Sequence, residues 1–192
     1  GINFYKNYKK IGISGLVGGI GLGIAMISFI YSITNTSAAI TLLCLAAMPF
    51  FTALLAFLFL KEKISFNVWI SIIIATIGII IMAIGNTEKS SLIGFIFGIL
   101  SSVGFSVFSV SLRWRKETPK FTTVAVAGFF CFLFATFIIL IKNQTFFSSS
   151  YNSTMFSLHG VIVCLGLILY SIGSRAIPAA ELTLLSLTEV IG

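Results

Sequence analysis

The sequence contains no aspartate, and charged residues of every kind are few. Charged side chains make up 9% of the 192 residues and hydrophobic ones 58%. A soluble domain carries roughly 25% charged residues because its surface must face water. The composition therefore excludes an ordinary soluble domain and indicates a chain whose solvent is lipid. The missing aspartates also exclude the carboxylate clusters that usually handle metal ions or phosphate groups.

Cysteine is scarce as well, and it forms no metal-binding pattern. Cys44, Cys131 and Cys164 all lie inside apolar runs, at unrelated depths. We expect them to be small apolar fillers, because their spacing is not that of metal ligands. The sequence predicts no metal site and no cofactor.

What the sequence does contain is a series of long uncharged runs. Crossing a bilayer core takes roughly 20 apolar residues, and such runs occupy residues 11–33, 37–60, 66–85, 92–112, 121–141 and 155–174. A seventh starts at Ala179 and is still running at Gly192, after a rise of only about 21 Å. The sequence predicts an all-α, polytopic transmembrane helix bundle, and we expect the chain to be a fragment that ends inside a helix.

Basic residues are distributed unevenly between the two ends of these runs. If the runs alternate in direction, ten of the 12 Lys and Arg residues fall on one side, and only Lys89 and Lys142 fall on the other. The positive-inside rule then places the Lys/Arg-rich loops in the cytoplasm of a multi-pass protein of the cell membrane. Because topology accounts for the net charge of +7, we expect no nucleic-acid partner.

One short motif occurs twice. Thr41-Leu-Leu-Cys-Leu45 lies within AAITLLCLAAMP at 38–49, and Thr183-Leu-Leu-Ser-Leu187 lies within AAELTLLSLTEVI at 179–191. By the charge count the first copy starts on the outer side and the second on the inner side. The two copies are therefore expected to cross in opposite directions, as in the inverted-topology repeats of many transporters.

The run PFFTALLAFLFLKEKIS at 49–65 resembles the signature of the EamA family in the drug/metabolite transporter superfamily. In that family a helix with a central proline ends in a Gly-Glu turn, where this chain has Lys61-Glu62. The run LLSLTEVIG at 184–192 looks like the matching helix of the second half. The resemblance implies ten helices in two inverted halves of five, of which this chain would hold the third to part of the ninth. Residues 1–86 would end the first repeat, and 87–192 would belong to the second.

Two helices carry rows of small residues spaced by four. The first row is Gly15, Gly19 and Gly23; the second is Gly94 and Gly98, continued by Ser102 and Ser106. Spacing by four puts each row on one helix face, where two backbones can approach closely. We expect these faces to pack helices together, at a seam between the two halves.

Pro49 lies near the middle of the apolar run 37–60. Proline removes one backbone donor and pushes aside the carbonyl four residues earlier, here that of Leu45. Irregular backbone at that depth is tolerated against protein or a water-filled cavity, not lipid. We expect Pro49 and the Leu45 carbonyl to line a central cavity, with Thr41, Cys44 and Met48 on the approach to it.

Two glutamates lie on the seventh apolar run. Glu181 belongs to the first turn, where a carboxylate suits the helix N-terminus. Glu189 is ten residues from Ala179, about 15 Å along a helix, and an ionisable group at that depth costs at least ~2.5 kcal/mol. Glu189 is the first candidate for function, with Thr183 and Ser186 near its face. It would either exchange a proton or pair with a cationic substrate, and the sequence leaves both open.

These features favour a secondary transporter of a small organic metabolite, such as an amino acid or amine, rather than an enzyme. Proton coupling and a homodimer stay open. An intramembrane enzyme is the first alternative, because Gly12-Ile-Ser14-Gly15 resembles a protease motif. The base would be His159, which is expected at the opposite membrane face from Ser14. A serine nucleophile and its base must lie within about 3 Å of each other. A channel is the second alternative, although no filter motif occurs.

Overall fold

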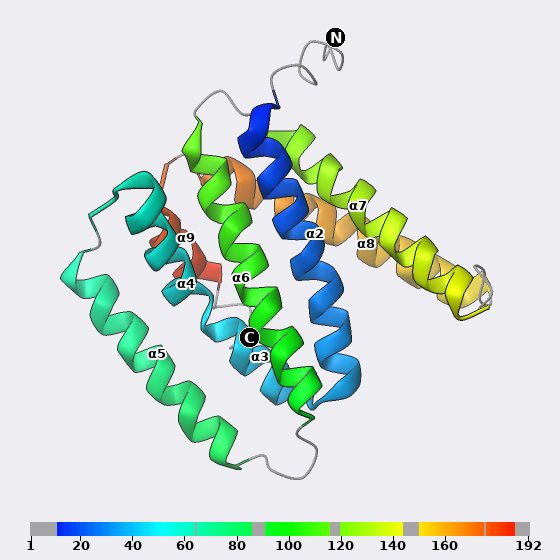
Figure 1. Ribbon diagram of the computed structural model, residues 1–192, viewed down its shortest axis with the longest axis horizontal. Coiled ribbons are helices and arrows are strands. Elements are labelled where there is room, and N and C mark those ends of the chain that lie inside the picture. Colours follow the sequence, from blue (N-terminus) through cyan, green and yellow to red (C-terminus); the bar gives the residue numbers. More distant parts are fainter. Residues whose placement is uncertain are drawn as a thin grey trace.

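The computed structural model describes residues 11–63, 65–85, 91–115, 120–143, 150–174 and 176–186. These ranges form helices joined by short links (Figure 1), and no strand occurs among them. In chain order the elements are α2 (Gly12–Asn35), α3 (Ala38–Ala46), α4 (Met48–Leu55), the π-helical stretch η1 (Ala56–Leu60), α5 (Phe66–Gly85), α6 (Leu92–Trp114), α7 (Lys120–Ile141), α8 (Ser150–Gly173) and α9 (Ala179–Ser186). The predicted all-α fold is confirmed.

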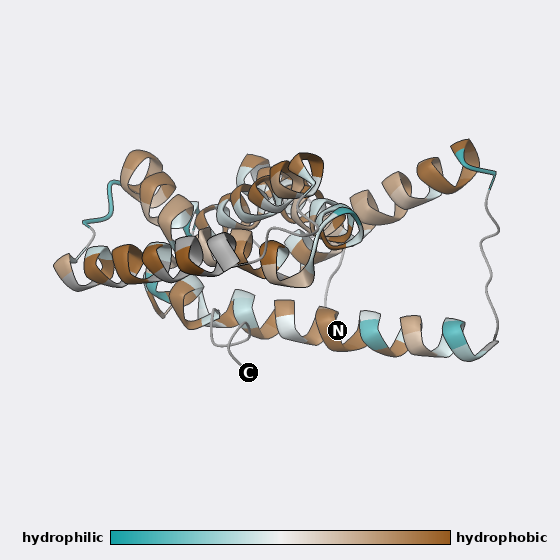
Figure 2. Cartoon of the chain, turned by 90° about the horizontal axis from the view of Figure 1, so that it is seen from below, coloured by the Kyte–Doolittle hydropathy of each residue, from teal (hydrophilic) through white to brown (hydrophobic). Residues whose placement is uncertain are grey.

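Five stretches of the described chain are long and apolar enough to cross a membrane. They are Gly12–Asn35, Ala38–Leu60, Leu92–Trp114, Phe121–Ile141 and Tyr151–Gly173. Helix α5, with 20 residues, covers the remaining predicted run at 66–85. Figure 2 shows apolar residues along all of these helices. The predicted polytopic helix bundle is confirmed, with one correction: α8 begins at Ser150, five residues before the apolar run at 155–174, because a helix can continue beyond its apolar part.

Helices α2 and α6 approach each other very closely. A Cβ atom at Gly104 would lie 2.6 Å from the carbonyl oxygen of Gly21 and 2.9 Å from the backbone nitrogen of Ala25. Beside this contact, Ser101 donates a 2.8 Å hydrogen bond to the Ala25 carbonyl. Later residues of α2 contact earlier residues of α6, so the two helices run antiparallel. They form the centre of the bundle (Figure 1).

The glycine row of α2 lies against α7. Gly15 is buried, a Cβ at Gly19 would lie 2.8 Å from the Cβ of Val126, and one at Gly23 would lie 3.2 Å from the Cβ of Phe130. Later residues of α2 contact later residues of α7, so the two helices run parallel. Small residues on different faces of α2 thus admit α6 and α7.

Basic side chains gather at one end of the bundle. Arg113, at the end of α6, pairs with Glu62, which follows η1. Arg115 lies beside Gly12 at the start of α2. Since α7 runs parallel to α2, Lys142 after α7 lies at the other end. We call these the basic end and the opposite end.

Helices α7 and α8 extend away from the central helices (Figures 1 and 2). Most of their large apolar side chains are exposed, among them those of Phe132, Phe137, Phe156 and Leu165. Exposed apolar surface of this kind suits contact with lipid rather than water.

Candidate functional site

The apolar stretch 38–60 is not one continuous helix. Helix α3 ends at Ala46 and α4 begins at Met48, with Pro49 in its first turn. Proline has no N–H to donate to the carbonyl four positions back. Ala47 instead donates to the Cys44 carbonyl over 3.1 Å, which tightens the chain into a turn. Pro49 is fully buried, so the break faces protein.

Hydroxyl groups of α6 hold the backbone on both sides of the break. Ser102 Oγ donates to the carbonyl of Cys44 at 2.5 Å, and Ser106 Oγ lies 3.1 Å from the carbonyl of Met48. Thr52 of α4 donates to Ser106 Oγ over 3.0 Å. Ser102, Ser106 and Thr52 are all fully buried. These two carbonyls lie on either side of Leu45 in the sequence. The carbonyl of Leu45 is the one that the sequence predicts to lose its backbone donor at Pro49.

Glycines on the same face of α6 bring it against α3. A Cβ at Gly98 would lie 2.7 Å from the Cβ of Cys44, and one at Gly94 would lie 2.7 Å from the Cβ of Thr36. The paired positions rise together, so α6 runs parallel to α3 and α4. The row from Gly94 to Ser106 therefore fits the broken helix: glycines allow the approach and serines bond the backbone.

The repeated threonines have matching local structure. Thr41 and Thr183 are both fully buried. Thr41 Oγ1 donates to the carbonyl of Ser37 over 3.3 Å, and Thr183 Oγ1 to that of Ala179 over 3.1 Å, each four residues back. Thr41 also shares a 2.9 Å hydrogen bond with Ser32.

Helix α9, which carries the second copy, packs on the end of the first. Ala179 lies in one apolar cluster with Ala56, and Ala180 lies in another with Ala53. In Figure 1, α4 and η1 rise in the view from α3, whereas α9 descends from the link that follows α8. The two segments therefore run in opposite directions where they touch.

Comparison with known proteins gives a family match for the first part of the chain. Residues 2–84 match the EamA-like transporter family. The resemblance that the sequence indicated is thereby confirmed over these residues.

Curated relatives agree with this match. An uncharacterized transporter of Helicobacter pylori strain J99 is 33% identical over 110 residues, which are 57% of this chain and 36% of the relative. An uncharacterized transporter of Clostridium kluyveri is 29% identical over 130 residues, 64% of this chain and 40% of the relative. The match thus spans less than half the length of these relatives. No solved structure matches at comparable significance.

Within the EamA-like segment, the turn after η1 explains the Gly-Glu pattern that the resemblance implies. Lys61 has a φ of 54°, in the left-handed region, and Glu62 N–H bonds back to the Ala56 carbonyl over 3.3 Å. Glycine adopts this conformation without steric cost. The resemblance places a glycine where this chain has Lys61. The turn needs a left-handed backbone conformation at this position, and lysine is less suited to it than glycine.

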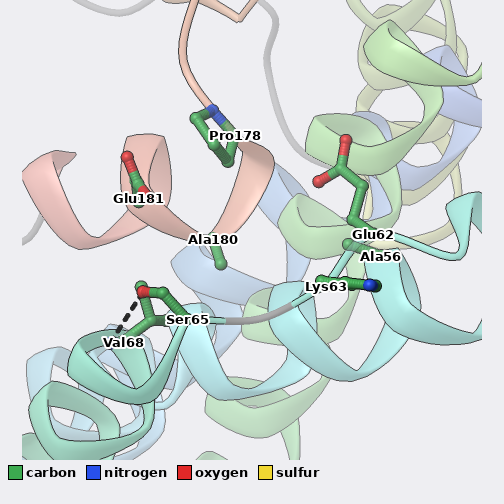
Figure 3. A pocket seen from close by; sticks show the side chains of 8 residues that line it. All are labelled: Ala56, Glu62, Lys63, Ser65, Val68, Pro178, Ala180 and Glu181. Carbon is green, nitrogen blue, oxygen red and sulfur yellow. Dashed lines mark hydrogen bonds between the residues drawn. The ribbon is translucent and has the colours of Figure 1, made fainter.

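The other predicted site residues, Glu181, Ser186 and Glu189, belong to the second copy of the motif. Glu181 is exposed and lines a hollow of about 50 Å³ at the basic end, together with Glu62 and Lys63 (Figure 3). Ser186 is half-buried and donates to the Thr183 carbonyl over 2.7 Å. Glu189 lies outside the described residues.

The arrangement around the break is closed. Thr41, Cys44, Met48 and Pro49 are buried, and Leu45 is half-buried. Within the described ranges, every buried side-chain nitrogen or oxygen has a hydrogen-bond partner. Serine and threonine hydroxyls both donate and accept, and they rotate freely. A hydroxyl that turns to a ligand stays paired, and the carbonyl that it leaves needs a second donor, as Ala47 N–H provides for the Cys44 carbonyl.

Sequence reasoning missed two features of this site. The sequence does not indicate Thr52 as a site residue, and its spacing predicts only a packing role for Ser102 and Ser106. The usable signal was their spacing: hydroxyls at positions four apart, in a row begun by glycines, can meet backbone carbonyls of a helix that the glycines admit.

Proposed function

We propose that this protein is a secondary transporter that moves a small organic metabolite across the cell membrane by alternating access. The observation that carries the proposal is the helix break at Ala47, beside the buried Met48 and Pro49, which hydroxyls from a second helix contact. Broken helices near the bilayer centre are where many secondary transporters bind substrate. The EamA-like match and the relatives' description as transporters support the same function.

The proposed architecture has two inverted halves, with a boundary between residues 86 and 87. The opposite directions of α9 and the α4–η1 segment support it. The basic end faces the cytoplasm in this proposal, because the positive-inside rule puts Lys and Arg there.

The substrate chamber forms between the two copies of the motif. Thr41, Cys44, Leu45, Met48 and Pro49 contribute from the first copy. From the second, Thr183, Ser186 and Glu189 contribute to the chamber and Glu181 to its mouth.

Glu189 is the coupling residue in this proposal. A carboxylate in a mainly apolar chamber either takes up and releases a proton during each cycle or pairs with an ammonium group of the substrate. Amino acids and amines are therefore the first substrates to test.

Uptake by the purified protein in proteoliposomes tests the proposal. We expect saturable uptake of a labelled amino acid or amine, and loss of that uptake in Glu189→Gln. Glu88→Gln, which changes a glutamate of the polar link between the runs 66–85 and 92–112, should behave as wild type. If an imposed pH gradient accelerates wild-type uptake, Glu189 carries a proton; if it does not, Glu189 pairs with the substrate. Conductance that does not saturate would instead establish a channel. Chemical conversion of the substrate would establish an enzyme.

A further inference from the structure

We propose that Arg113 is a latch that closes the basic end of the bundle and that must release when this end opens. The inference rests on the proposed alternating-access function. Arg113 Nε donates to Glu62 Oε1 over 2.7 Å. Its Nη1 donates to the carbonyls of Ser174 and Ile177, at 3.1 and 2.5 Å. One side chain thus binds two separate links of the chain.

The segments that Arg113 joins adjoin the helices that carry the two copies of the motif. Glu62 follows η1, the last part of the apolar stretch 38–60 that carries the first copy. Ser174 and Ile177 lie in the link between α8 and α9, directly before the second copy. Arg113 itself ends α6. Any movement of α9 away from η1 at this end would have to break contacts of Arg113 on one side or the other.

Arginine suits this position better than lysine would. Its planar guanidinium presents five N–H donors in fixed directions. Here Nε serves the carboxylate of Glu62, while Nη1 serves two backbone carbonyls. An ammonium group is a point charge and would not bridge the same three acceptors with this geometry.

The contact beneath the latch is small and apolar. Ala56 of η1, Val110 of α6 and Ala179 of α9 form one buried cluster, with Leu55 and Leu60 packed against it. Ala179 is 0% exposed and Ala56 1%. Alanines let α9 touch η1 directly, so this cluster seals the basic end when the latch is closed.

Water already reaches the edge of this seal. The side chains of Arg113 and Glu62 are 24% and 25% exposed, so solvent weakens their attraction and the latch is reversible. Glu62 also lines the small hollow beside the seal, with Lys63, Ala180 and Glu181 around it (Figure 3). This hollow marks where a path between η1 and α9 would begin.

Cysteine accessibility tests the latch without requiring a substrate. Ala180 lines the hollow and is buried, so Ala180→Cys reports the separation of α9 from α4. The protein is placed in lipid nanodiscs and treated with a water-soluble maleimide, and modification at position 180 is quantified by peptide mass spectrometry, which separates it from the native cysteines. Ile40→Cys, in the first turn of α3 at the opposite end, is a second buried reporter.

Arg113→Ala should raise the modification rate at position 180 about tenfold, because it shifts the ratio of open to closed molecules toward the open form. Glu62→Gln and Arg113→Lys should raise it less, since each keeps part of the bonding. Arg115→Ala removes an exposed charge at the same end and should leave the rate unchanged. If Arg113→Ala fails to insert, Arg113→Lys and Glu62→Gln decide the question.

Two outcomes would overturn the latch. One is a rate at position 180 that is the same in the Arg113 and Glu62 variants as in Arg115→Ala. The other is an equal rise at positions 40 and 180, which would mean that Arg113 only stabilises the whole fold. If the wild-type protein shows no saturable uptake but Arg113→Ala still raises the modification rate at position 180, the proposed function is wrong and the latch stands.

Discussion

The hydroxyl of Ser106 lies 3.1 Å from the carbonyl oxygen of Met48, the residue that directly precedes Pro49. Pro49 breaks one helix, and a serine of another helix, 58 positions from Met48, contacts the backbone beside the break. The same hydroxyl lies 2.7 Å from the Ser102 carbonyl of its own helix. The break is therefore a property of two helices together. If the chain has two halves, the second half holds the irregular backbone of the first.

Ser106→Ala should destabilise the protein. It removes the hydrogen bond to Met48 and leaves the Thr52 hydroxyl without its acceptor on α6. We expect the free energy of unfolding to fall by about 1–2 kcal/mol, measured by thermal unfolding in detergent. Ser111→Ala is the control, because Ser106 and Ser111 are both buried and both bond a carbonyl of their own helix, while Ser106 also contacts α4. Equal losses in the two variants would show that the contact across helices adds nothing.

Gly104→Ala should disrupt the bundle. The added methyl would lie 2.6 Å from the Gly21 carbonyl and 2.9 Å from the Ala25 nitrogen, both rigid backbone atoms. Helices α2 and α6 would have to separate, at a cost of about 3 kcal/mol or more, in line with overpacked cores. Gly166→Ala on α8 is the matched control, because a Cβ there meets nothing within 4 Å. That control should be neutral or slightly stabilising, as alanine favours helix; unfolding measurements that rank the two alike would contradict the close approach.

Lys61→Gly should stabilise the turn after η1. Lys61 adopts a φ of 54°, which costs a residue with a side chain roughly 1 kcal/mol relative to glycine. We expect a higher melting temperature for Lys61→Gly and no such gain for Lys61→Ala, which removes the same charge but keeps a Cβ. A gain of equal size in both variants would mean that the charge, and not the backbone, was responsible.

The sequence predicts most helix positions because the lipid imposes a simple rule. Apolar runs long enough to cross the bilayer become helices, and α2, α5 and α7 each lie within a few residues of their predicted runs. The break near Pro49 follows from the chemistry of one residue. These features depend on local sequence alone.

Contacts between helices are harder to predict, because they depend on register. The sequence around Glu62 does not predict its ion-pair partner. Lys61 and Lys63 are adjacent, yet the carboxylate pairs with Arg113, 51 positions away. In the same way, the serine row of α6 is visible in the sequence, but its alignment with the carbonyls of Cys44 and Met48 appears only when the two helices are packed.

Pro49→Ala separates the local role of the break from its role in transport. Alanine restores a backbone donor for the Leu45 carbonyl and favours a continuous helix. The regained hydrogen bond should offset the packing lost at this buried position, so the free energy of unfolding should change by less than about 1 kcal/mol in thermal unfolding. If the break belongs to the substrate chamber, saturable uptake should nevertheless fall at least tenfold, about 1.4 kcal/mol in activation free energy. Phe50→Ala is the control, because Phe50 is adjacent but exposed and has a normal backbone donor. Full uptake in Pro49→Ala would mean that the irregular backbone serves packing only, and it would remove the observation on which the transport proposal chiefly rests.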